Sequence, residues 1–362
     1  MKGILVPIVA FFLVPIIGIL QDMSSKLSPK ELDELHQALK ADSVLAQMVE
    51  GFGDPVMLYE QFKTNLLADD SLWKYDQEHV KPFLDVGSTR RFEMLPLIDW
   101  FSSSDSLVHE SGVAYLLRTD DATILFDVGL NRQDADPSPL LKNMERLGVR
   151  LEDIDMIVIS HPHSDHVGGS KWEDQGSFSL TSHQIPLGHK QVFTPIPMVY
   201  PGVEPVYARQ PTRIAKGVAA IGVIRRPLFF GETEEQALAI DVEGKGIVIV
   251  SGCGHQTIEK LLQRTKRLFQ RPIYALLGGF HLPLTEGRNI HRYYKYVVTG
   301  RLPWVFLEAA DITNIIGGLK RSGVHVVGVS GHDTCDSTIA MFKTAFGSSY
   351  ADIAVGKIVT FK

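Results

Sequence analysis

The chain has 362 residues, of which 44% are hydrophobic and 22% charged, and its formal net charge is −6. This is the composition of an ordinary globular protein with enough apolar residues for a large core or for two domains. The acidic balance and the lack of a long basic run argue against a nucleic-acid partner, which requires a positive surface. The two cysteines, Cys253 and Cys335, exclude a disulfide framework, which needs several pairs.

The N-terminal stretch MKGILVPIVAFFLVPIIGIL is almost wholly apolar from Ile4 to Leu20. A run of about seventeen residues is at the lower limit for a membrane-spanning helix. The run is longer than the core of a typical signal peptide, and no A-x-A-like cleavage site follows it. We therefore expect residues 1–21 to be an uncleaved signal anchor that contacts the membrane through residues 4–20 and leaves the catalytic domain extracytoplasmic. The alternative is a cleaved signal peptide and a secreted protein.

A helical arm is expected over residues 22–91. The sequence SPKE at residues 28–31 combines an N-cap serine, a proline in the first turn and a glutamate three positions after the cap. Leucines then recur at helical spacing, and a second helix start lies at Asp54-Pro55. Such amphipathic helices are usually spacers or packing elements, and this is the role that we expect for the arm.

From about residue 92 short apolar runs alternate with helical patterns as far as residue 362. Runs of this kind are typical of strands that are buried on both faces of a sheet, with helices packed over them. Several of the runs end in a glycine-rich turn that carries a polar residue. The runs are MLPLI, GVAYLL, ATILFDVG, DMIVIS, GIVIVSG, IYALLGG and VHVVGVSG. Residues 92–362 are therefore predicted to form one catalytic domain of the α/β (α+β) class.

The sequence SHPHSDHVGG at residues 160–169 follows one of these apolar runs directly. It places His161, His163, Asp165 and His166 within six positions, next to two glycines at which the backbone can turn. Imidazole and carboxylate groups together suit zinc, manganese or iron. We therefore predict a metal site at the end of this strand.

Other metal-binding residue types recur in the same context. Asp127 follows ATILF, His255 follows GIVIV, His281 follows IYALL and His332 follows VHVVG, with only short turns between. Unrelated structural histidines would not be expected to share this position. The repeated context predicts that these side chains meet at one edge of the sheets, where strand ends converge.

The H-x-H-x-D-H motif of residues 161–166, with Asp127 upstream and His255 and His332 downstream, resembles the metallo-β-lactamase superfamily. The resemblance implies a four-layer αββα sandwich over residues 92–362, with one or two metal ions at the sheet edge. Within the superfamily the chain is most similar to the metal-dependent hydrolases related to dihydropterin–ribofuranosylaminobenzene-phosphate synthase. The matching segments are HESGVAYLLRTDDATILFDVG, SGCGHQTI, LLGGFHL and FGSSYADIAVGKIVTF.

The resemblance also implies two neighbouring metal positions. The ligands of the first would be His161, His163 and His255. The ligands of the second would be Asp165, His166 and His332. Asp127 would hold a ligand turn by hydrogen bonds, as metal-bound histidines generally require. The expected cofactor is zinc, as one or two ions, with Mn²⁺ or Fe²⁺ as alternatives.

One departure from the superfamily concerns the region between His255 and His332, where a bridging carboxylate or a cysteine is common. Here His281 occupies that region, and a neutral imidazole cannot bridge two cations. His281 is therefore either a ligand of one metal, which we favour slightly, or a hydrogen-bond donor to the substrate. Cys253 and Cys335 could each be a metal ligand, because thiolate binds zinc well. We favour the alternative interpretation, in which each is a buried thiol.

The predicted chemistry is hydrolysis. Metal ions lower the pKa of bound water toward neutrality, and the resulting hydroxide attacks a carbonyl carbon or a phosphorus atom. Asp165 would orient the nucleophile and take its proton, so Asp165 and His281 are the candidate catalytic residues. The sequence thus predicts a membrane-tethered hydrolase that cleaves an ester, lactone or phosphoester in a small-molecule substrate. The alternatives are a pterin-type synthase acting on a phosphorylated ribosyl substrate, and a non-catalytic metal-binding sensor or scaffold.

Overall fold

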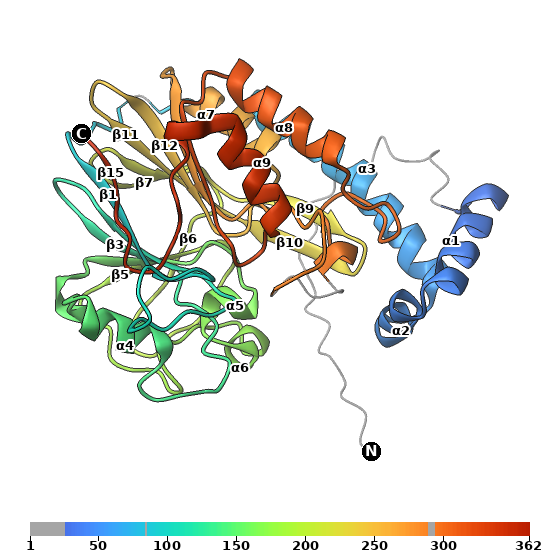
Figure 1. Ribbon diagram of the computed structural model, residues 1–362, viewed down its shortest axis with the longest axis horizontal. Coiled ribbons are helices and arrows are strands. Elements are labelled where there is room, and N and C mark those ends of the chain that lie inside the picture. Colours follow the sequence, from blue (N-terminus) through green and yellow to red (C-terminus); the bar gives the residue numbers. More distant parts are fainter. Residues whose placement is uncertain (1–25, 84, 289–293) are drawn as a thin grey trace.

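The structure is a computed structural model that describes residues 26–83, 85–288 and 294–362. Two β-sheets pack face to face, helices cover their outer faces, and a helical arm extends from one side (Figure 1). The predicted mixed α/β fold is confirmed by this layering.

The first sheet has seven strands in the order β15-β1-β2-β3-β4-β5-β6. These strands are β1 Phe92–Ile98, β2 Ala114–Arg118, β3 Thr123–Phe126, β4 Met156–Val158, β5 Gln191–Thr194, β6 Val206–Tyr207 and β15 Val359–Phe361. Neighbours from β3 to β6 are parallel, and Phe126 at the end of β3 pairs with Val158 at the end of β4. Asp127 and the turn that carries His161 therefore leave the sheet side by side.

The second sheet has six strands in the order β14-β13-β12-β11-β8-β7. These strands are β7 Thr212–Ala215, β8 Val218–Ala220, β11 Leu238–Val242, β12 Gly246–Ser251, β13 Ile273–Gly278 and β14 Val326–Val329. β12, β13 and β14 are parallel, with Ser251 opposite Gly278 and Gly278 opposite Val329. The turns that follow these three strands thus start at the same edge. A separate hairpin joins β9 (Ile224–Leu228) to β10 (Gly231–Glu235).

Two groups of helices cover the sheets (Figure 1). The first group is α4 Pro139–Arg146, α5 Ser164–Val167 and α6 Ser170–Asp174. The second group is α7 Ile258–Leu268, α8 Ala309–Arg321 and α9 Asp336–Phe346. Short 3₁₀ helices lie at Leu151–Asp153, Tyr294–Tyr296 and Gly347–Ser349. Between the sheets lies an apolar core in which Phe126 and Val158 of the first sheet and Val250 and Leu277 of the second are fully buried. Its burial is the main driving force for the sandwich.

The arm consists of α1 Pro29–Ala41, α2 Ser43–Phe52 and α3 Pro55–His79. At the start of α1 the Ser28 hydroxyl accepts the backbone N–H of Glu31, and the Glu31 carboxylate accepts the backbone N–H of Ser28. Asp54 caps α3 by accepting the backbone N–H of Met57. Both predicted helix starts are confirmed. The division of the chain into anchor, arm and catalytic domain stays a prediction.

A buried ion cluster joins α3 to the sandwich. The Asp69 carboxylate accepts the ammonium of Lys260 on α7 at 2.8 Å and also pairs with the guanidinium of Arg226 on β9. The side chains of Asp69, Lys260 and Arg226 are only 6%, 9% and 12% exposed. The Trp73 ring lies under the same ammonium, 4.7 Å from its centroid. This part of the arm is therefore packed on the body of the protein.

Replacing Asp69 by alanine should lower the free energy of unfolding by about 3–5 kcal/mol, because it leaves two buried cations without their carboxylate. Asp70→Ala is the matched control, since Asp70 is the exposed neighbour on the same helix. Denaturant unfolding of both variants measures the difference. Equal stabilities would show that the cluster does not hold the arm.

The predicted membrane anchorage and extracytoplasmic location are wrong on the present structure. Within residues 26–83, 85–288 and 294–362, no helix combines the length and the apolar composition that crossing a bilayer requires. The longest described helix, α3, has 25 residues but carries charged side chains along its length, including Lys63, Asp69 and Asp76. Such charges are costly in hydrocarbon. The proposed anchor at residues 4–20 lies outside the described residues.

Candidate metal centre

Four turns that follow β4, β12, β13 and β14 meet at one edge of the sandwich and carry the predicted ligands. Two glycines permit the close approach. A Cβ on Gly252 would lie 2.2 Å from the hydroxyl oxygen of Ser160, and one on Gly279 would lie 2.5 Å from Cε1 of His332. Both distances are far below van der Waals contact, so a larger residue at either position would force the turns apart.

The structure brings all of the sequence-predicted ligands together. The ring centroids of His161 and His163 are 4.5 Å apart, and His255 lies 5.1 Å from the first and 5.0 Å from the second. The ligand-capable atoms of the second predicted set, Asp165, His166 and His332, lie within 4.8 Å of one another, together with Cys253. The ligand atoms of the first predicted set do not form one such group: those of His161 lie close to His163 and Asp165 and, in a separate group, to Cys253 and His255.

The chemistry of these side chains fits a cation. Nε2 of His161, Nε2 of His255 and both ring nitrogens of His281 are buried without a hydrogen-bond partner. Buried polar atoms in proteins are nearly always paired, so several orphans at one place indicate a missing partner. Burial lowers the pKa of His161 and of His255 well below the usual range, and neighbouring histidines lower it further. Both rings are therefore neutral, which is the form that binds metals.

Asp127 supports the ligand turn after β4. Its carboxylate accepts the Ser160 backbone N–H at 2.6 Å, the Ser160 hydroxyl at 2.7 Å and Nδ1 of His166 at 2.7 Å. Because Ser160 gives its proton to Asp127, the contact of 2.9 Å between Ser160 and Nδ1 of His161 has the imidazole as donor. In the neutral ring of His161 the protonated Nδ1 leaves the lone pair of Nε2 free, as a metal ligand requires.

A second carboxylate relay of the same kind was not predicted. The Ser330 hydroxyl donates to Asp99 at 2.5 Å and lies 2.7 Å from Nδ1 of His332, so this imidazole is again the donor. Tyr115 also donates to Asp99 at 2.8 Å, and burial raises the pKa of Asp99 to about 6. A sequence signal existed, because Asp99 directly follows the apolar run of β1 just as Asp127 follows that of β3.

Two further buried carboxylates hold the remaining turns. Glu235 accepts the backbone N–H groups of Cys253, Gly254 and His255 at 2.7–3.0 Å. Asp333 accepts the backbone N–H of His281 at 2.7 Å. Sequence reasoning missed both residues: Glu235 is one acidic residue among several in its strand. Each of the four ligand turns is therefore held by its own carboxylate.

The relay from Asp99 makes a specific prediction. Asp99→Asn should weaken metal binding at the His332 position by about 10–100-fold, the usual effect of losing a residue that orients a ligand. Metal titration of the stripped variant measures this affinity directly. Asp121→Asn, an exposed aspartate on the body of the protein, should bind as the parent does. Unchanged affinity in Asp99→Asn would show that Asp99 does not orient His332.

His281 lies beside His255 in the candidate metal centre, but its ring nitrogens are not grouped with those of the first predicted ligand set. Its ring is 4.8 Å from His255 and 5.9 Å from Tyr294, and burial lowers its pKa to about 4. Its φ of 48° is unusual for a residue other than glycine, and such strain concentrates at functional sites. The structure thus places His281 within reach of a metal or a substrate without choosing between these roles.

The two cysteines differ. Sγ of Cys253 lies among the predicted ligands, whereas Cys335 stands at the N-cap position of α9 and its sulfur accepts the backbone N–H of Thr285 at 3.3 Å. Cys335 belongs to no ligand group among the described residues, which agrees with a buried thiol.

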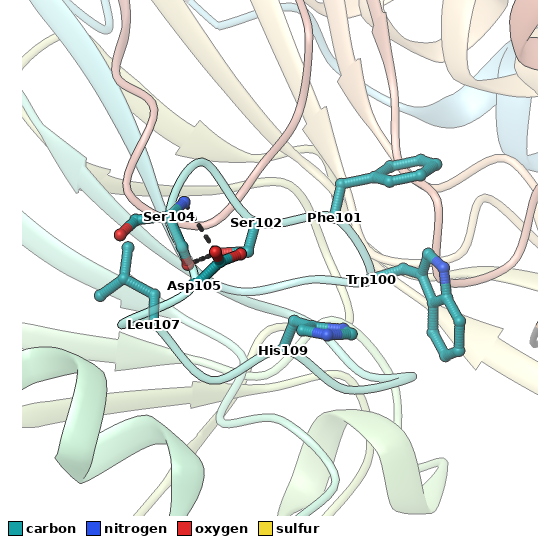
Figure 2. A pocket seen from close by; sticks show the side chains of 7 residues that line it. All are labelled: Trp100, Phe101, Ser102, Ser104, Asp105, Leu107 and His109. Atoms are coloured by element: carbon teal, nitrogen blue, oxygen red, sulfur yellow. Dashed lines mark hydrogen bonds between the residues drawn. The ribbon is translucent and has the colours of Figure 1, made fainter.

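A surface cavity of about 370 Å³ adjoins the His332 turn. Figure 2 shows its lining residues, which come from the loop after β1: Trp100, Phe101, Ser102, Ser104, Asp105, Leu107 and His109. A Cβ on Gly331 would meet the Phe101 ring at 2.5 Å, so this loop packs directly against the turn that carries His332. The loop therefore links the cavity to the candidate metal centre.

Comparison with known proteins shows which fold the chain has. Residues 108–175, which include the H-x-H-x-D-H motif, match the family model of the metallo-beta-lactamase superfamily. The fold is also that of the crystal structure of Tm1679, a metal-dependent hydrolase of the beta-lactamase superfamily. That structure has a TM-score of 0.50 at 20% identity and covers 74% of this chain and 98% of its own. The resemblance inferred from the sequence is confirmed: the protein has the metallo-β-lactamase fold.

Two proteins of Methanocaldococcus jannaschii are similar over longer stretches. One is 7,8-dihydropterin-6-methyl-4-(beta-D-ribofuranosyl)-aminobenzene-5'-phosphate synthase, 24% identical over 325 residues that cover 77% of this chain and 99% of the synthase. The other is an uncharacterized protein, 25% identical over 215 residues that cover 52% of this chain and 78% of that protein. The predicted similarity to the synthase subgroup is confirmed.

Proposed function

We propose that the protein is a metal-dependent hydrolase that cleaves an ester, lactone or phosphoester in a small-molecule substrate. The observation that carries this proposal is the set of buried, unpartnered imidazole nitrogens that converge with carboxylates at one sheet edge. Such a set is costly to leave without a cation.

The proposed ligand assignment follows the resemblance to the metallo-β-lactamase superfamily. His161, His163 and His255 would hold one ion, and Asp165, His166 and His332, whose ligand atoms lie within 4.8 Å of one another, would hold a second. A ligand set rich in imidazole with one carboxylate favours zinc, with Mn²⁺ and Fe²⁺ as alternatives. When bound, such ions supply Lewis-acid chemistry and lower the pKa of water toward neutrality.

Three residues of the chain would act on the water molecule and the substrate. Oδ2 of Asp165 lies 3.6 Å from Nε2 of His166. This carboxylate would orient a water molecule and accept its proton. Burial raises the pKa of the Tyr294 phenol, and the nearby charge of Asp165 raises it further, so this hydroxyl stays protonated and can donate to a substrate oxygen. His281 can bind either a metal or the oxygen on which negative charge develops.

A substrate screen tests the proposal. Protein stripped of metal should be inactive, and addition of Zn²⁺, Mn²⁺ or Fe²⁺ should restore hydrolysis of at least one class among esters, lactones, phosphodiesters and β-lactams. Metal binding without any turnover would instead support the sensor or scaffold alternative.

A second candidate rests on the relative from Methanocaldococcus jannaschii, because the alignment covers 99% of that synthase. The alternative is a synthase that joins a pterin to a phosphorylated ribosyl aromatic. Incubation of the metal-loaded protein with these two reactants separates the candidates, since a condensation product would favour the synthase and its absence alongside ester or lactone cleavage would favour the hydrolase.

A further inference from the structure

Cys253 occupies a position between the histidines of the candidate metal centre. Its sulfur lies 3.1 Å from Nε2 of His166 and 3.1 Å from Nε2 of His332, and the residue is only 3% exposed. Glu235 holds the backbone of this turn through the N–H of Cys253 itself. The sulfur is therefore held at a defined place by the fold.

The sulfur is shared among the ligand groups. The described residues contain four groups of side chains whose ligand-capable atoms lie within 4.8 Å of one another, and Cys253 takes part in three of them. In the first its partners are Asp165, His166 and His332. In the second they are His161 and His255. In the third they are His281 and Asp333. Among the described residues no other side chain enters three groups.

The hydrogen bonds of the His166 and His332 rings determine which nitrogen of each ring faces the sulfur of Cys253. Nδ1 of His166 donates to Asp127, and Nδ1 of His332 donates to Ser330, so Nε2 of each ring is the nitrogen that faces the sulfur of Cys253. One sulfur thus lies between the metal-binding nitrogens of two rings, at 3.1 Å from each. This is a position from which a thiolate could bind cations held by both rings.

We propose that Cys253 binds metal as a thiolate and is shared between the two metal positions. This inference rests on the proposed metal-dependent function. A thiolate carries the negative charge that two neighbouring cations require, which the neutral imidazole of His281 does not. On metal binding the S–H bond breaks, its proton passes to the solvent, and the sulfur lone pairs bind the metal.

X-ray absorption at the zinc edge of the zinc-loaded full-length protein tests this assignment. A sulfur neighbour at about 2.3 Å is expected in the parent protein, because Zn–S bonds have this length. Cobalt-loaded protein should likewise show a thiolate-to-cobalt charge-transfer absorption. Both signals should vanish in Cys253→Ser and persist in Cys335→Ser, the control at the other cysteine.

The outcomes separate this inference from the proposed function. Metal bound without a sulfur neighbour would overturn the role of Cys253 and leave the metal-dependent function standing. A sulfur signal lost in Cys335→Ser but kept in Cys253→Ser would overturn it as well. Failure of the parent protein to bind zinc or cobalt at all would overturn both. If Cys253→Ser does not fold, the parent spectrum and the Cys335→Ser control still decide the assignment.

Discussion

Replacing His163 by alanine should remove the metal from the first position and abolish hydrolysis. The imidazole of His163 lies beside those of His161 and His255, and its loss leaves only two of the three imidazole ligands at this position. We expect metal affinity to fall by more than the roughly 10–100-fold that follows loss of an orienting residue.

Elemental analysis and the hydrolytic assay on the same preparation measure this prediction. His36→Ala is the matched control, because it is the same substitution at an exposed histidine on α1, in the arm and away from the candidate metal centre. The control should retain the metal content and turnover of the parent. Full activity in His163→Ala would rule out the assignment of this histidine as a ligand.

Replacing His281 by alanine should give the second largest effect. Because its two ring nitrogens are buried without partners, we expect the ring to bind a metal, and metal affinity should fall by about 10–100-fold or more in its absence. If the ring instead donates to the developing oxyanion, metal content should stay intact and the rate should fall by about 10²–10³.

Metal titration beside turnover separates these outcomes for His281. His325→Ala, an exposed histidine just before β14, serves as the control for a histidine change in the same sheet. Lower affinity in His281→Ala supports the ligand role, and unchanged affinity with slower turnover supports the donor role. Unchanged affinity and unchanged turnover together would leave His281 as a structural residue.

The buried strands could be predicted because their sequences are nearly continuous apolar runs. β3, β4, β12, β13 and β14 are buried on both faces, and each was recognisable from composition alone. The hairpin of β9 and β10 could not be found in this way. Charged residues such as Arg225 and Glu232 pair across it at the surface, so its strands contain no apolar run.

The histidines of the site could be predicted because each follows a buried strand after a short turn. Among the supporting residues Asp127 was predicted through the family resemblance, whereas Asp99, Glu235 and Asp333 were not, because their roles depend on which turns meet in space. Asp99 contacts Ser330, which in turn contacts His332, across 231 positions of sequence, and Cys253 contacts His166 across 87. A local sequence pattern can mark Asp99 as the residue after a buried strand, but it does not show which distant residue it contacts.

The membrane prediction shows a different limit. It rested on the apolar composition of residues 4–20 alone, and the described helices contain no candidate for a spanning segment. The charged helices of the arm are instead joined to the sandwich, as the contacts of Asp69 show.

Metal content is the most direct test of the central claim, that the turns after β4, β12, β13 and β14 form a metal centre. The purified protein should be supplied with zinc, freed of unbound metal and measured by elemental analysis. The account predicts between one and two ions per chain. A protein that carries no metal as purified and takes up none on addition would contradict it.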